Sequence, residues 1–66
     1  MTGKILWVDK RDGNGIIKDL NGYEYYFDTS VTKDFHNLKS NDTVEFVIND
    51  LIKDCRCAKQ VKVLNG

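Results

Sequence analysis

Residues 12–30 read DGNGIIKDLNGYEYYFDTS and decide the fold of this 66-residue chain. Two runs rich in β-forming residues, 14–19 and 23–27, flank the pair Asn21-Gly22, which strongly favours a tight hairpin turn. Gly13-Asn14-Gly15 opens the first run, where two glycines let the backbone bend sharply or let another group approach closely. The segment therefore predicts a ribbon of two antiparallel strands.

The two faces of this ribbon differ in character, because successive side chains of a strand point to opposite sides. In the second run, one face can supply a hydrophobic core with the rings of Tyr23, Tyr25 and Phe27. The other face carries a ring and two acids toward water, namely Glu24, Tyr26 and Asp28. In the first run Ile17 points to one side, and the other side carries Asn14, Ile16 and Lys18.

Three further segments, 4–10, 43–48 and 56–63, complete a pattern of five strands. Their apolar side chains are expected to anchor the strands in one core: Ile5, Val8, Val44, Phe46, Ile48, Val61 and Val63. The connection 33–42 is a long polar loop, which Leu38 is expected to fasten to the core. Leu51-Ile52 has no obvious face and is expected to cover one end. No convincing helix pattern is present, so the sequence predicts an all-β fold.

Length and charge set limits on function. A chain of 66 residues forms one domain, which spans residues 1–66. Ten basic and ten acidic residues leave no formal net charge, whereas proteins that hold nucleic acid by counterion release usually carry a basic excess. Neutrality predicts weak, salt-sensitive binding unless the charges are segregated. No charged leader precedes an apolar run and no stretch could span a bilayer, so a soluble, cytoplasmic protein without a membrane partner is expected.

Metal, redox and catalytic chemistry have little support in the sequence. Cys55 and Cys57 are the only cysteines and His36 is the only histidine; a zinc site would need a second pair of ligands, and a disulfide framework would need more cysteines. Two free thiols are expected, with no metal and no cofactor. A catalytic site needs a nucleophile or base with a partner and a pocket, so the chain is not expected to be an enzyme.

Several segments resemble the bacterial cold-shock domain. Residues 12–17, DGNGII, are similar to the family motif KGFGFI at both glycines and the last isoleucine. Residues 24–30, EYYFDTS, resemble the motif DVFVHFS at the leading acid, the third-position aromatic and the final serine. Residues 3–9, GKILWVD, resemble GKVKWFN, and the segments 35–38 and 44–48 resemble the aromatic loop and the fourth strand. The correspondence covers nearly the whole chain.

This resemblance implies a five-stranded antiparallel OB-fold barrel that binds single-stranded RNA or DNA. The five strands, the long connection after the third and the lack of a convincing helix fit such a barrel. The resemblance further implies a nucleic-acid chaperone or a regulator of transcription or translation, which keeps strands unpaired by capturing exposed bases. Neither ATP nor metal would be required, and a monomer is expected.

The family's stacking face falls on Trp7, Asn14, Ile16, Tyr26, Asp28, Thr29 and Phe35. Bases stack on flat rings, each worth about 1–3 kcal/mol, while cations follow the phosphates. Trp7, Tyr26 and Phe35 would form the main platform, with cations supplied by Lys4, Lys10, Arg11 and Lys18. Asp28 stands where the family has His and Asp12 where it has Lys, and these acids should repel phosphate and weaken binding.

Three alternatives stay open in the sequence. Trp7 shares the side of Ile5 by strand periodicity, which favours the core, whereas the resemblance places Trp7 on the ligand face. Phe35 could be a second core anchor or an exposed ring at the rim, and the family pattern favours the rim. The face could also serve a protein partner in an OB-fold adaptor, because residues such as Leu6 and Ile16, together with Asn14 and Thr29, make it more neutral and apolar than a phosphate-binding surface.

Overall fold

A computed structural model describes residues 1–49 and 56–64. Its strands and two short 3₁₀ turns follow one another as β1 (Thr2–Asp9), β2 (Asn14–Asp19), β3 (Glu24–Asp28), η1 (Thr29–Val31), η2 (Phe35–Asn37), β4 (Thr43–Ile48) and β5 (Ala58–Val63). One sheet with the order β3-β2-β1-β4-β5 contains all five strands, and each neighbouring pair is antiparallel. The prediction of an all-β fold with a five-stranded antiparallel sheet is confirmed. Within the described ranges, no helix has the length and apolar character needed to cross a membrane.

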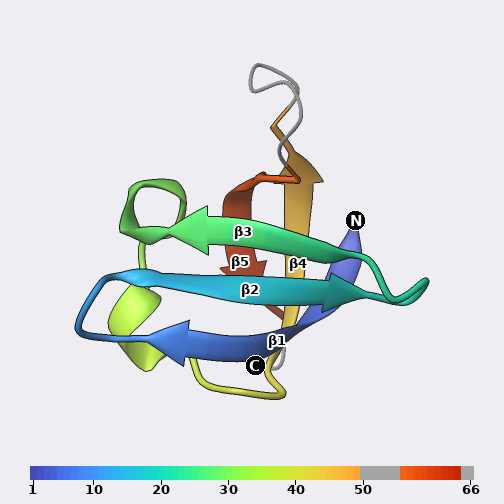
Figure 1. Ribbon diagram of the computed structural model, residues 1–66. Helices are drawn as coiled ribbons and strands as arrows, with labels where there is room; N and C mark the ends of the chain where they lie inside the picture. The colour runs from blue at the N-terminus through green and yellow to red at the C-terminus, as the bar shows by residue number, and fades with distance from the viewer. Residues whose placement is uncertain (50–55, 65–66) are drawn as a thin grey trace.

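Two bulges curl this sheet. In β1 the register shifts between Ile5 and Trp7, which leaves Leu6 as an extra residue opposite β2. The β4–β5 pairing shifts as well, and Gln60 in β5 has a positive φ of 54°. A bulge bends its strand and increases the local twist. Figure 1 shows the result, with β4 and β5 crossing steeply behind β1, β2 and β3.

Among the described residues, the two edges of the sheet meet where β3 approaches Arg56 and Cys57. The backbone N–H of Tyr26 in β3 donates to the carbonyl of Arg56 at 2.7 Å, and Tyr26 and Cys57 form an isolated parallel bridge. No continuous ladder joins β3 to β5 in the part of the chain that the structure describes. The sheet is therefore strongly curled but not closed into a continuous barrel.

The hydrophobic core fills the space between the two layers of the curled sheet. Its buried members are Ile5, Ile17, Tyr25, Phe27, Phe35, Leu38, Val44, Phe46, Ala58 and Val61. The rings of Tyr25 and Phe46 face each other across the core with centroids 5.0 Å apart. The predicted anchors on β1, β4 and β5 and in the long connection are confirmed, since Val8, Ile48 and Val63 also pack against this cluster.

The predicted hairpin between β2 and β3 is confirmed, but its loop includes Leu20 as well as Asn21-Gly22. The carbonyl of Asp19 accepts from the amide of Gly22 at 3.1 Å, and Gly22 has a φ of 89°. This is the geometry of a three-residue loop that ends in a glycine with left-handed backbone. Tyr23 consequently lies before β3 and is exposed, so the expectation that its ring faces the core is wrong.

Asp19 locks the hairpin from inside. Its buried carboxylate accepts from the backbone N–H groups of Asn21 and Tyr23, each at 2.9 Å, and from the hydroxyl of Tyr25 at 3.0 Å. Burial by itself raises the pKa of this carboxyl, but the hydrogen bonds from Tyr23, Tyr25 and Asn21 outweigh it and leave the pKa below its ordinary value. Burial, together with the hydrogen bond to Asp19, raises the pKa of the Tyr25 hydroxyl.

The expectation of two free thiols is wrong for Cys57, which is disulfide-bonded in the structure. Cys55 lies outside the described residues, as does the pair Leu51-Ile52 that was expected to cover one end of the sheet.

Candidate nucleic-acid interface

The outward face of β1, β2 and β3 carries a row of three side chains that we call the aromatic row: Trp7, Ile16 and Tyr26. Trp7 is paired with Ile16 in the β1–β2 ladder, and Ile16 is paired with Tyr26 in the β2–β3 ladder. Directly paired residues point to the same face of a sheet. Neighbouring strands lie about 4.8 Å apart, so the two rings are separated by about 10 Å with Ile16 between them. Trp7 is 43% exposed and Tyr26 is 39% exposed.

The bulge at Leu6 explains why strand periodicity misplaced Trp7. Ile5 is buried, and simple alternation would bury Trp7 on the same side. Because Leu6 is the extra residue, the alternation is reset and both Leu6 and Trp7 point to water. The exposed position that the family resemblance implied for Trp7 is the one observed.

Phe35 does not belong to this face. It opens η2, is only 3% exposed, and packs with its ring centroid 6.1 Å from that of Phe27 in the core. The expectation of an exposed Phe35 ring at the rim is wrong, because the connection after β3 folds inward to cover the open end of the core. The outward face of β1–β3 therefore offers two aromatic rings instead of three.

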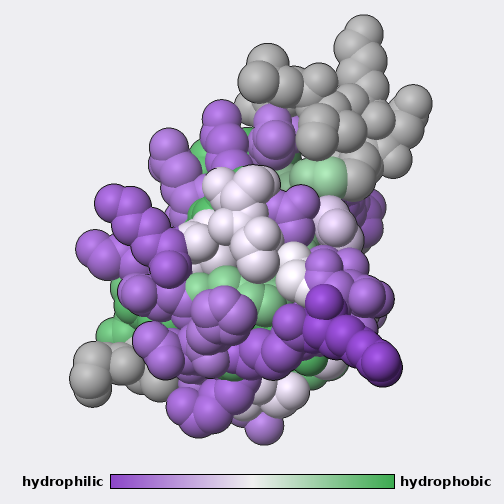
Figure 2. All heavy atoms as spheres, turned by 90° about the vertical axis from the view of Figure 1, so that its left-hand side faces the viewer, coloured by the Kyte–Doolittle hydropathy of each residue, from purple (hydrophilic) through white to green (hydrophobic). Residues whose placement is uncertain are grey.

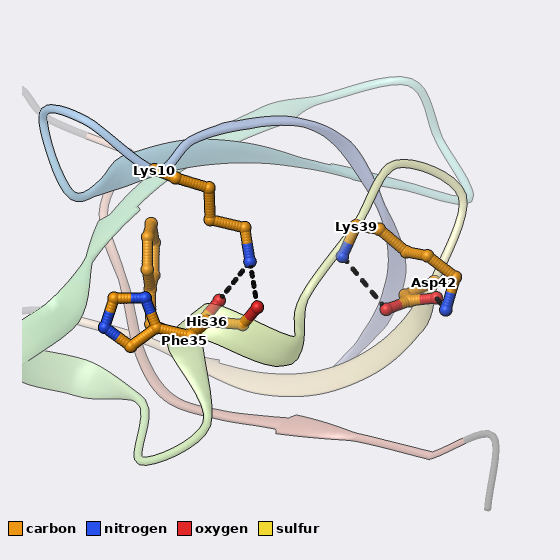
Figure 3. A network of polar contacts seen from close by, with 5 residues as sticks. All are labelled: Lys10, Phe35, His36, Lys39 and Asp42. Atoms are coloured by element: carbon orange, nitrogen blue, oxygen red, sulfur yellow. Dashed lines mark hydrogen bonds and ion pairs between the residues drawn. The ribbon is translucent and has the colours of Figure 1, made fainter.

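Lys10 braces the turn between β1 and β2 against η2. Its Nζ donates to the carbonyl of Phe35 at 2.9 Å and to the carbonyl of His36, and lies 5.5 Å from the centre of the Phe35 ring (Figure 3). In the same view, an ion pair of 3.2 Å between Lys39 and Asp42 closes the loop that leads into β4. Lys10 thus holds two segments of the chain together, which leaves its ammonium group poorly placed to follow a phosphate chain.

One end of the face is acidic. Asp9, Asn14 and Asp28 form a cross-strand row there. The carboxylate of Asp28 accepts from the backbone N–H of Ser30 at 2.9 Å and from its hydroxyl at 2.5 Å, and so caps η1. The carboxylate of Asp9 accepts from the N–H groups of Arg11 and Asp12 at 2.9 and 3.0 Å. Both carboxylates therefore stabilise turns of the backbone. This role accounts for acidic residues beside a surface that is expected to bind phosphate.

Thr29 and Arg11 also lie at this acidic end and are exposed. Thr29 begins η1 and donates its backbone N–H to the carbonyl of Gly13 at 3.1 Å, which ties η1 to the turn before β2. Figure 2 views this end of the molecule and shows a mainly hydrophilic surface. Its neighbouring charges of both signs give little net attraction for a polyanion.

The opposite end of the face is basic. Lys4, Lys18 and Glu24 form the corresponding row there, and all three are exposed. The charges of the face are therefore partly segregated along the strands, with two acids at one end, the aromatic row in the middle, and two lysines and one glutamate at the other end. Segregation of this kind was the condition under which a neutral chain could still attract phosphate.

The sequence interpretation already placed Leu6 on this face, but it missed Leu20. Leu6 joins the apolar centre of the face because of the bulge, and Leu20 stands at the hairpin tip beside the two lysines, 90% exposed. Neither exposure follows from strand periodicity, since that of Leu6 depends on the bulge in β1 and that of Leu20 on the loop between β2 and β3.

The face can offer two flat rings for stacking, an apolar surface between them and cations at one end. Base stacking and phosphate attraction need these groups. No model of a known protein family matches the chain, and comparison with curated proteins gives no significant match.

Proposed function

We propose that this chain is a cold-shock-like protein of the OB-fold type that binds single-stranded RNA or DNA weakly. An OB fold is a five-stranded, partly open barrel that binds oligonucleotides around its second and third strands. The strand order, the strong curl and the parallel bridge between Tyr26 in β3 and Cys57 just before β5 support this assignment. The motifs shared with the cold-shock domain at residues 12–17 and 24–30 support it further.

The aromatic row is the observation that carries the proposal. Trp7 and Tyr26 lie exposed on one face with Ile16 between them. Bases stack on such rings with little sequence preference, since every base has a flat face, and each stack contributes about 1–3 kcal/mol. Two rings and few cations give low affinity. A base held on the row cannot pair, so binding keeps strands open without ATP, as a nucleic-acid chaperone or regulator requires.

A protein partner is the second candidate, and the exposure of Leu6 favours it. Leu6 and Trp7 are neighbours on the outward face, so the apolar centre is broader than two stacking rings need. Protein contact with such a patch would depend little on salt, whereas binding of nucleic acid weakens steeply as salt rises.

The fluorescence of Trp7, the only tryptophan in the chain, provides the test. Titration with oligo-dT and mixed RNA of about eight nucleotides, within the site size of an OB fold, should quench it at low salt. Raising the salt from about 50 to about 200 mM should weaken the binding. Absence of quenching at low salt with high micromolar oligonucleotide would contradict the proposal of nucleic-acid binding. The OB-fold adaptor that binds a protein partner would then be the remaining candidate.

Tyr26→Ala should lower the affinity about 5- to 150-fold, the equivalent of one lost stack. Tyr23→Ala is the matched control, because Tyr23 is an exposed tyrosine outside the aromatic row, stacked beneath Arg56 at 4.3 Å. Equal affinities of the two variants would show that the row is not the binding surface. Circular dichroism of both variants verifies that each is folded.

A further inference from the structure

We propose that the basic end of the face is a second subsite, which holds a phosphate and the neighbouring base of the strand bound at the aromatic row. The inference rests on the proposed function and extends it. The subsite is a hollow of about 360 Å³ that we call the lysine hollow, lined by Lys4, Ile5, Leu6, Lys18, Asp19, Leu20 and Asn41. Its volume lies within the range of about 300–1,000 Å³ typical of small-ligand sites.

Two lysines with the same charge stand directly opposite each other at this hollow. Lys4 on β1 is paired with Lys18 on β2. Like charges at paired positions destabilise a sheet. Within residues 1–49 and 56–64, neither ammonium group makes an ion pair or a hydrogen bond. Glu24 is the other neighbour of Lys18. The carboxylate of Asp19 also lines the hollow, but it already accepts three hydrogen bonds from the hairpin. An anion shared by both lysines would relieve the repulsion.

Apolar side chains flank the two lysines. Leu20 projects from the hairpin tip with 90% of its surface exposed, and Leu6 is half exposed on β1. The tip is held in place, because the carboxylate of Asp19 accepts from two backbone N–H groups of the loop. On the far side, Asn41 donates its backbone N–H to the carbonyl of Ile5 at 2.8 Å. Cations beside aliphatic side chains match the two parts of a nucleotide, its phosphate and the apolar face of its base.

The lysine hollow continues the aromatic row along the strands. Lys18 follows Ile16 by two residues on β2, a distance of about 7 Å. One sugar-phosphate linkage can cover this distance, so a single strand can occupy both places. The acidic row of Asp9 and Asp28 lies on the opposite side of the aromatic row and repels phosphate. The bound strand should therefore leave the row toward the hairpin tip, away from the turn between β1 and β2.

The test compares Lys4→Gln/Lys18→Gln with Lys33→Gln/Lys62→Gln, which removes the same charge at exposed positions away from the face. Affinity for oligo-dT is measured by Trp7 fluorescence over a range of salt. Loss of the two phosphate contacts should reduce the slope of log affinity against log salt by about 0.7–1.4 in the first variant only. Leu20→Ser should lower the affinity several-fold and leave the slope unchanged, because it removes contact with a base and no charge.

The outcomes separate the two proposals. If the native protein binds oligo-dT and both double variants keep its affinity and slope, the lysine hollow is wrong and the aromatic row stands. If the native protein gives no quenching, both proposals fall. The Leu20 methyl signals should shift with oligo-dT and stay in place with polyglutamate. Equal shifts with both would overturn the assignment of a nucleotide and indicate an acidic peptide.

Discussion

At the scale of single residues, an extra side chain in β1 decides what the face presents to solvent. Leu6 interrupts the alternation of the strand, so Ile5 stays in the core while Trp7 turns outward. The ring of Trp7 then joins Ile16 and Tyr26 in one row. A sheet without this bulge would bury Trp7 and leave a single exposed ring on the face.

Asp19 makes the stability of the protein depend on pH. Its hydrogen bonds keep the pKa of the carboxyl below the ordinary value of 3.8. A group whose pKa falls on folding stabilises the protein above its unfolded pKa, and this contribution is lost as the pH falls through the folded pKa. Asp19→Asn should lower the stability at neutral pH and flatten its decline below about pH 4.

Urea denaturation at several pH values provides the measurement for Asp19. The matched control is Asp34→Asn, because Asp34 is exposed and its side chain does not cap η2. The control should follow the pH profile of the native protein. A profile of Asp19→Asn with the same slope as the native protein would contradict the role assigned to this carboxylate.

At the scale of elements, the residue that caps η1 is also expected to weaken the binding of nucleic acid. Asp28 caps η1 and yet places a negative charge beside Tyr26. Asp28→Asn should keep the cap, since Asn is as good a capping residue, and remove the repulsion of phosphate. At about 1 kcal/mol for an exposed charge pair, the affinity for oligo-dT should rise up to about fivefold.

Asp28→Ala separates the two roles of this side chain. It removes the charge and the cap together, so it should also bind more tightly but lose about 0.5–2 kcal/mol of stability. Titration and urea denaturation of both variants give the two quantities. Weaker binding by Asp28→Asn would show that the carboxylate takes part in binding.

The elements themselves were largely predictable from the sequence, whereas parts of the site were not. Alternation in 23–27 and 43–48 placed Tyr25, Phe27 and Phe46 in the core, as observed, because an alternating pattern has only one way to bury its apolar side. The position of Phe35 depends on contacts between segments far apart in the chain, which no local pattern encodes. The hydrogen bond from Lys10 to Phe35 joins residues 25 positions apart, so it could not be predicted from a local pattern either.

At the scale of the whole molecule, the connection after β3 works as a cover for the core and not as part of the binding face. Phe35→Leu should therefore lower the stability by less than about 1.5 kcal/mol, as a hydrophobic exchange of similar size. Its affinity for oligo-dT should equal that of the native protein. Phe35→Ala should cost about 3–5 kcal/mol, because it leaves a cavity beside Phe27.

Thermal unfolding and Trp7 fluorescence measure these two effects of Phe35 separately. Tyr26→Ala serves as the opposite case, with its ring on the surface and its loss expected in binding. If Phe35→Leu lowers the affinity as much as Tyr26→Ala does, Phe35 takes part in binding and the role assigned to it here is wrong.

Tyr26 has two tasks that meet in one residue. Its ring belongs to the aromatic row, while its amide makes the 2.7 Å hydrogen bond to Arg56 where the two sheet edges touch. A base stacked on the ring would hold that junction shut, and opening of the junction would tilt the ring away. Hydrogen–deuterium exchange at the Tyr26 amide should therefore slow in proportion to the fraction of protein with bound ligand. The exchange rate of this one amide would then report how much ligand is bound.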